Sequence, residues 1–210
     1  MSDNDGEAKT ALPAHFNSRE CQICFESLGT AEKKRFMPCC GETLCIQCSK
    51  KWAKQCAFCR TPETHDPVEI VNRARKRAEA GCAAAQFFLG SCNYDGHYVA
   101  QDHTEAARWF RLAADQGNAE AQCNLGNSYC KGEGVVQDDA EAVRWYRLAA
   151  DQSYVMAQCN LGKCYFNGWG VVADFEVAAQ WFKLAAQQGH EGAKADFRIA
   201  IGAIKDARSK

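Results

Sequence analysis

Residues 121–156 read AQCNLGNSYCKGEGVVQDDAEAVRWYRLAADQSYVM, and the chain carries a close copy of this stretch on either side. Residues 85–120 read AQFFLGSCNYDGHYVAQDHTEAARWFRLAADQGNAE, and residues 157–192 read AQCNLGKCYFNGWGVVADFEVAAQWFKLAAQQGHEG, so the period is 36 residues. A fixed period of this length predicts a solenoid, since one unit alone cannot bury its apolar face. Equivalent positions carry Leu89, Leu125 and Leu161; Gly90, Gly126 and Gly162; and Trp109, Trp145 and Trp181.

Each unit is expected to fold as two helices joined by a short loop. The first helix spans about ten residues, as in 85–94, and ends at Gly96, Gly132 or Gly168. The second begins after an aspartate, whose carboxylate can accept backbone N–H bonds at the positive end of the helix dipole. In the first two units a glutamate three residues later gives the spacing of a capping box, whereas the third has Val177, so we expect its start to be less firmly fixed. The aspartates are Asp102, Asp138 and Asp174, and the glutamates are Glu105 and Glu141.

Two positions depart from the repeat where the chain turns. Gly117 and Gly189 can adopt the left-handed conformation that often ends a helix. Ser153 stands at the equivalent position of the second unit, which predicts a local cost in stability. Tyr98 stands where the other units have a glycine (Gly134 and Gly170), so the conformation of the first loop is left open.

Two further helices are predicted at the ends of the array. Residues 67–81 form a linking and capping helix, since Pro67 suits a first helical turn and Gly81 suits a stop. Residues 193–206 form a closing helix, so the repeat array extends over residues 85–206. The spacing places four residues of the linking helix on one face: Val68, Val71, Arg75 and Ala78.

Composition and charge narrow the class of protein. The chain has 210 residues, 47% hydrophobic and 24% charged, with a net charge of -1. These values are ordinary for a soluble globular protein and give no support to nucleic-acid binding. Residues 1–15 contain no apolar run, and no stretch of about 18 apolar residues follows, so we expect neither a secretory signal nor a membrane span. The expected compartment is therefore reducing: the cytoplasm, with the nucleus as an alternative.

The fourteen cysteines fall into two groups. Six lie in the repeat region at core or small-residue positions, and we interpret them as small buried groups. The other eight fall within residues 21–59, where three C-x2-C pairs accompany one adjacent pair; in a reducing compartment this spacing indicates zinc. The eight are Cys21, Cys24, Cys39, Cys40, Cys45, Cys48, Cys56 and Cys59.

The cysteine-rich segment, residues 18–64, is too small to hold itself together by burial alone. Metal binding would supply most of its folding free energy. Residues 1–17 are expected to be a disordered leader. The predicted fold is therefore a small zinc-stapled module followed by an all-α solenoid of helix-turn-helix repeats.

The three repeated units resemble Sel-1-like repeats, which are related to the tetratricopeptide class. The resemblance covers about residues 85–192 and the half-units at both ends. It rests on three elements that recur in register: A-Q-x-x-L-G, then G-x-G-V-x-x-D, then A-x-x-W-[FY]-x-x-A-A. The resemblance implies that the array binds a protein or a peptide.

The cysteine-rich segment resembles a RING finger of the all-cysteine type. Ile23 lies inside the first C-x2-C pair, Trp52 is four residues after Cys48, and Arg60 directly follows Cys59. In the RING family these are contact positions for a ubiquitin-conjugating enzyme, so the resemblance implies the same partner here. Pro38 also stands in its usual place before the central cysteines, whereas Ala57 replaces a common proline, which weakens that expected contact.

The resemblance implies two structural zinc ions held in a cross-brace. The first would bind Cys21, Cys24, Cys45 and Cys48, and the second would bind Cys56, Cys59 and two central residues. No histidine lies between Cys21 and Cys59. The second site is therefore completed either by Cys39 and Cys40 together or by Cys40 with Glu42 or His65, because carboxylate and imidazole are also zinc ligands.

Two functions follow from these resemblances. The leading hypothesis is a RING-type ubiquitin ligase, in which the zinc module positions a charged conjugating enzyme and the repeats bind a substrate or adaptor protein. Arg60 would donate hydrogen bonds to both the enzyme and ubiquitin. The alternative is a non-enzymatic zinc-binding scaffold for protein–protein interaction. No nucleotide loop, nucleophile motif or hydrolase triad occurs, so we expect no covalent or acid–base chemistry in the repeats, and no nucleic-acid or membrane partner.

Overall fold

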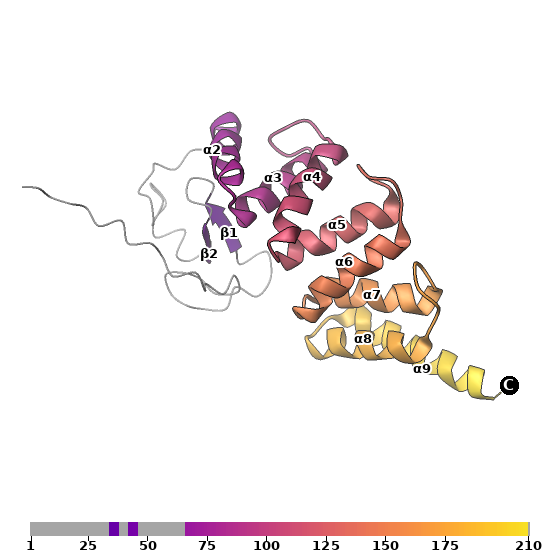
Figure 1. Cartoon of the computed structure of the whole chain (residues 1–210). Coiled ribbons are helices and arrows are strands. Elements are labelled where there is room, and N and C mark those ends of the chain that lie inside the picture. The colour runs from indigo at the N-terminus through magenta and orange to yellow at the C-terminus, as the bar shows by residue number, and fades with distance from the viewer. Residues whose placement is uncertain (1–33, 38–41, 46–65, 210) are drawn as a thin grey trace, which may run out of the picture.

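The computed structural model describes residues 34–37, 42–45 and 66–209 of the chain. Within these residues the helices follow one another as antiparallel hairpins along a single array, from α2 to α9 (Figure 1). Seven of them have 13 residues each, and α9 has 18. The helices are α2 (Pro67–Glu79), α3 (Ala83–Asp95), α4 (His103–Asp115), α5 (Ala119–Lys131), α6 (Asp139–Asp151), α7 (Val155–Asn167), α8 (Phe175–Gln187) and α9 (Glu191–Arg208).

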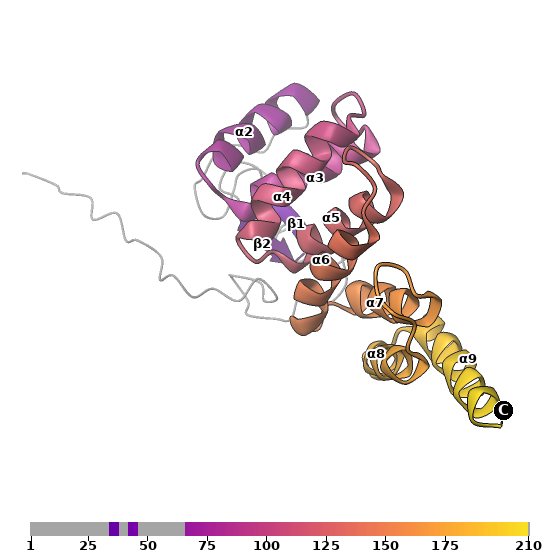
Figure 2. The same cartoon turned by 45° about the vertical axis from the view of Figure 1, so that its right-hand side comes forward.

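The predicted solenoid of paired helices is confirmed, with longer first helices than expected. The first helix of each unit begins two residues before the repeat boundary taken from the sequence, as α3 does at Ala83. The closing helix likewise runs from Glu191 to Arg208 rather than over residues 193–206. Figure 2 shows how α9 extends past α8 at the C-terminal end.

A short antiparallel hairpin precedes the array. Strand β1 (Lys34–Met37) pairs with β2 (Glu42–Cys45), so that Met37 lies opposite Glu42 and Lys34 lies opposite Cys45. The hairpin lies beside α3 (Figure 1). Four residues, 38–41, join the two strands in the sequence.

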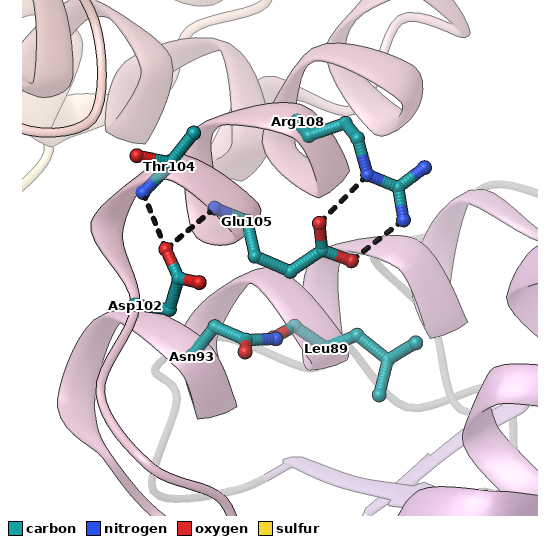
Figure 3. A network of polar contacts seen from close by, with 6 residues as sticks. All are labelled: Leu89, Asn93, Asp102, Thr104, Glu105 and Arg108. Atoms are coloured by element: carbon teal, nitrogen blue, oxygen red, sulfur yellow. Dashed lines mark hydrogen bonds and ion pairs between the residues drawn. The ribbon is translucent and has the colours of Figure 1, made fainter.

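The second helix of each unit begins at its aspartate, as predicted. In Figure 3 the Asp102 carboxylate accepts the N–H groups of Thr104 and Glu105, at 2.9 and 3.0 Å. The expected reciprocal bond of a capping box is absent here, because the Asp102 N–H already donates to the Asn93 carbonyl at 2.8 Å. Glu105 turns instead to Arg108, with N–O distances of 2.6 and 2.8 Å.

The expectation that Val177 weakens the start of the third unit is wrong. The Asp174 carboxylate accepts the N–H groups of Glu176 and Val177 at 2.9 and 3.0 Å, the same distances as in the first unit. In the first unit the side chain of Glu105 takes no part in the cap. The valine at the equivalent position of the third unit therefore removes no hydrogen bond from the start of the helix. Asp138 caps α6 in the same way.

Left-handed residues end the second helices and shape the loops. Ser153 has φ +62°, the conformation that Gly117 adopts at φ +86° in the first unit. Tyr98 has φ +67°, so the first loop keeps the conformation of the other two. At Gly134 and Gly170 a second constraint applies, because a Cβ atom would lie 1.9 Å from the His103 carbonyl oxygen and 2.2 Å from that of Asp139. Each of these two loops therefore packs closely against the first turn of the second helix in the preceding unit.

Tryptophans fill the space between units. Trp145 is 4% exposed and packs in a buried cluster with Ala106, Phe110 and Ala113 of α4, in the preceding unit. Trp109 packs in the same manner against α2. The tryptophan of a second helix thus reaches across to the unit before it and fills the space between the two units, as the alanine and tryptophan pattern predicts.

A ladder of glutamines joins the units through buried polar contacts. Gln122 is 4% exposed; its amide donates to the Ala114 carbonyl at 3.1 Å and its oxygen accepts from Gln152 at 2.8 Å. Gln86 and Gln158 make the equivalent contacts. Because a buried amide is stable only when its hydrogen bonds are satisfied, this ladder fixes the register of one unit on the next.

Helix α2 takes the place of a second helix in front of the first unit. It buries Val71, Ala74 and Ala78 against α3 and Trp109. Of the four residues that the spacing places on one face, Val71 and Ala78 are buried, whereas Val68 is 65% exposed and Arg75 is also exposed. The contact with α3 follows positions 71, 74 and 78, and position 68 lies in the first turn, beyond this contact.

Candidate functional site

The second helices expose a column of cations. Arg75, Arg111, Arg147 and Lys183 are separated by 36 residues each and occupy the same exposed position on α2, α4, α6 and α8. The 36-residue period of the sequence is the signal that locates this column, although none of the repeat motifs specifies a cation at this position. We call these four residues the cation column.

Two arginines of the column are held in place by the following unit. Arg111 donates to the phenol oxygen of Tyr129, and Arg147 donates to that of Tyr165. Each guanidinium also lies near the ring of the same tyrosine, 5.5 and 5.9 Å from its centre. A guanidinium has five N–H donors, so each retains donors for another acceptor. A neutral phenol does not neutralise the positive charge.

A neighbouring pair of arginines is already neutralised. Arg108 forms an ion pair with Glu105 at 2.6 Å, and Arg144 forms one with Glu141 at 3.2 Å. Both guanidinium groups stack over the adjacent tryptophan rings, at 4.2 and 5.0 Å from the ring centres. The hydrogen bonds and charge of Arg108 lower the pKa of Glu105. The structure therefore separates arginines with a carboxylate partner from arginines of the cation column.

Half-exposed leucines lie beside the column. Leu112, Leu148 and Leu184 each directly follow a column residue and are 39%, 42% and 44% exposed. In α2 the same position carries Lys76 instead. The same apolar side chain thus recurs at one surface position in three consecutive units.

A groove of about 340 Å³ opens beside the column on α6. Its floor is one face of α6, from Ala140 to Asp151, and its wall is the loop at Gly170 and Val171. The close approach of Gly170 to the start of α6 sets this wall in place. The groove is lined by Ala140, Val143, Arg144, Arg147, Leu148, Asp151, Gly170 and Val171.

Carboxylates lie beside the column. Asp115 and Asp151 are exposed, four residues after Arg111 and Arg147. Neither aspartate forms an ion pair with these arginines in the structure. In α8 the equivalent residue is Gln187, which carries no charge. The groove thus presents cations, apolar side chains and a row of acceptors side by side.

The predicted zinc and conjugating-enzyme residues lie outside the described residues, except Cys45, whose backbone ends β2. These residues are Cys21, Cys24, Cys39, Cys40, Cys48, Cys56, Cys59, Ile23, Trp52 and Arg60. Of the alternative ligands, Glu42 begins β2 and His65 lies outside. Within residues 66–209 and the two strands, no group of three His, Cys, Asp or Glu residues is arranged to hold a metal.

The cysteines of the repeats form no disulfides. Cys92, Cys123, Cys159 and Cys164 are buried, as predicted, whereas Cys82 and Cys130 are only partly covered. Burial raises the pKa of Cys92, Cys123 and Cys164 to about 12. These thiols therefore stay protonated near neutral pH and act as small apolar groups rather than nucleophiles.

Among the described helices, none combines the length and the apolar character needed to cross a membrane.

The fold and the exposed face define the class: an α-solenoid repeat protein with an extended surface built from equivalent residues of successive units. The Sel1 repeat matches residues 83–118, 119–154 and 155–190. The chain belongs to the Sel1 repeat family. No curated protein matches it.

Three solved structures show the same architecture. A protective antigen of uropathogenic Escherichia coli strains with an SLR fold is 39% identical, with a TM-score of 0.61, over 64% of this chain. This chain spans only 28% of that antigen's length. A Sel1 repeat protein from Oxalobacter formigenes is 37% identical, with a TM-score of 0.56, over 61% of this chain and 96% of its own. Cysteine-rich protein B of Helicobacter pylori, 20% identical with a TM-score of 0.50 over 60% of this chain and 92% of its own, shares the fold.

Proposed function

We propose that this protein is a protein-interaction adaptor, in which the repeat array binds a partner protein along the exposed face of the second helices. The observation that carries the proposal is the recurrence of one surface pattern in successive units, a cation followed by a half-exposed leucine. Stacked repeats of this kind provide extended binding surfaces. The groove on α6 gives that surface a defined site in which a side chain of the partner can bind.

Site-specific photo-crosslinking in cells tests this proposal. The photoreactive amino acid benzoylphenylalanine is placed at Leu148, in the groove, or at Glu191, which is exposed at the start of α9. We expect a protein adduct at position 148 that is absent at position 191. No adduct at 148, or the same adducts at both positions, would contradict an adaptor role for this face.

Under this proposal the zinc module is a second protein-binding region of the adaptor. The cysteine spacing favours two structural zinc ions, held by the ligands named above, and such ions stabilise a fold without reacting. The module would connect the partner on the repeats to a second protein. Measurement of zinc in the purified chain by mass spectrometry should give two ions, and substitution of Cys21 and Cys24 by serine should remove at least one.

A RING-type ubiquitin ligase is the second candidate function, favoured by Arg60 directly after Cys59 and by Ile23 and Trp52 at RING contact positions. In this role the module would hold a charged ubiquitin-conjugating enzyme in a reactive arrangement, which is catalysis by positioning. Discharge of ubiquitin from a panel of charged enzymes should then depend on Arg60. If Arg60→Ala leaves zinc content and discharge unchanged, or if no enzyme of the panel responds, the ligase role is excluded and the adaptor remains.

A further inference from the structure

We propose that the cation column and its leucines bind an acidic segment of a partner protein that also carries apolar side chains. This inference rests on the proposed adaptor function and names the chemistry of its partner. It concerns the exposed face of α2, α4, α6 and α8, which all lie in the described part of the chain.

The positive charge of the cation column favours a carboxylate as the contacting group of the partner. Arg111 and Arg147 are held by tyrosine phenols, which fix the guanidinium without neutralising it. A carboxylate in front of such a group gains charge-assisted hydrogen bonds, often two in parallel. Because the tyrosine already restrains the arginine, less side-chain freedom is lost when the partner binds.

The leucines select an apolar side chain next to the carboxylate. Leu148 and Val171 line the α6 groove, whose volume of about 340 Å³ is small for a ligand pocket and suits one or two side chains. The leucine follows the arginine directly in the sequence. The segment would therefore place an acid and an apolar residue close together at each unit it touches.

The residues at and beside the cation column change from α2 to α8, and this change predicts the direction in which the partner segment binds. In α2 the column position and the next one are both cationic, Arg75 and Lys76, whereas later helices carry a leucine in second place. At the other end, α8 has Val177 and Gln180 where α6 has the ion pair of Glu141 and Arg144, so its surface there carries no charge. The most acidic end of the partner segment would therefore lie on α2, and its more apolar end on α8.

A peptide fits this face better than a nucleic acid. A phosphate strand would bring negative charge against Asp115 and Asp151, which border the column, and would leave the three leucines without apolar contacts. In a peptide, backbone N–H groups can donate to these aspartates while acidic side chains contact the cation column. Both the aspartates and the cations then have partners. Contacts at successive units would then add up along one segment.

A random 16-residue peptide library displayed on phage, selected on the full-length chain, tests the inference. The enriched peptide is synthesised with a fluorescent label, and its affinity is measured for the wild type, Arg147→Gln and Arg198→Gln. The two variants remove the same charge, but Arg198 is exposed on α9 and lies outside both the groove and the cation column. We expect about a tenfold loss of affinity for Arg147→Gln and no more than about a twofold loss for Arg198→Gln. Both side chains are exposed, so the melting temperatures should match.

Several results would overturn the inference. They are enrichment of peptides without Asp or Glu, equal losses in the two variants, or a 20-nucleotide single-stranded DNA that binds as tightly as the selected peptide. Reversal of charge gives a further check, since a peptide with lysine at the selected acid should prefer Arg147→Glu. The adduct at position 148 in cells is independent of this chemistry. If it persists while the library gives no acidic peptide, the adaptor function stands and only the partner's chemistry is wrong.

Discussion

Helix α5, which forms a hairpin with α6, and the closing helix α9 begin at equivalent positions of the repeat. After this common start they continue differently. In the hairpin, Gly126 faces the ring of Tyr146, where a Cβ atom would lie 2.7 Å from the ring carbons. In α9 the equivalent residue is Arg198, and the terminating Gly132 is replaced by Ile204. Without the first glycine no second helix can pack as closely, and without the second the helix runs on to Arg208.

This difference shows what a repeat of this protein requires. The apolar pattern alone gives a helix that covers its neighbour, as α9 covers α8 through Phe197, Ala200 and Ile201. A glycine at the helix crossing and another at the helix end turn that helix into half of a hairpin. Four sets of substitutions test this requirement, in order of decreasing expected effect on the free energy of unfolding.

Removal of a tryptophan between units should have the largest effect. Trp145→Ala should lower the free energy of unfolding by about 4 kcal/mol, because it leaves a cavity between α4 and α6. Trp181 is less buried, near the C-terminal end of the array, so Trp181→Ala should cost less. Urea unfolding followed by circular dichroism measures both, and an equal loss would contradict the view that depth within the array sets the value of each tryptophan.

The crossing glycine should come next. Gly126→Ala forces its Cβ atom against Tyr146 and should cost about 2 kcal/mol. Gly202→Ala in α9 is the matched control, since its Cβ atom would meet nothing within 4 Å. The control should stabilise the protein by about 0.5–1 kcal/mol, because alanine favours the helix interior. If both substitutions act in the same direction, the crossing does not depend on glycine.

Loss of a helix cap should have a smaller effect. Asp138→Ala removes the acceptor for the N–H groups of Ala140 and Glu141 and should cost about 1 kcal/mol. Asp138→Asn keeps an acceptor oxygen and should cost much less. In contrast, Glu141→Gln should leave the cap intact, and a loss as large as that of Asp138→Ala would show that the glutamate does take part in it.

Ser153 offers a small gain in stability. Its φ of +62° is strained for serine but ordinary for glycine, the residue at the same place in the first and third units. Ser153→Gly should raise the free energy of unfolding by roughly 0.5–1 kcal/mol. The reverse change, Gly117→Ser, should lower it by a similar amount, and thermal unfolding of the pair measures both.

The sequence predicted most of the array because its signals are local and repeated. The 36-residue period, the aspartate caps and the turn residues each specify backbone conformation without reference to distant parts of the chain. The sequence was less informative where spatial neighbours decide. Nothing local says that the N–H of Asp102 is taken by Asn93, which frees Glu105 for Arg108. Likewise, only the packing against α3 decides that positions 71, 74 and 78 are the buried ones in α2.

The candidate site depended even more on tertiary contacts. All the arginines of the second helices look alike in the sequence. Only the structure shows that Arg144 pairs with Glu141 while Arg147 is held by Tyr165 of the next unit. The groove on α6 likewise needs a loop from the following repeat, which Gly170 brings close to the helix.

Competition at the groove shows whether the partner protein binds the cation column. Cells carrying the photoreactive amino acid at Leu148 are lysed and illuminated with or without the selected acidic peptide, at a concentration that saturates the column. We expect the peptide to abolish the partner adduct at position 148, because peptide and partner occupy the same cations and the same groove. An undiminished adduct in the presence of bound peptide would show that the partner does not use this face.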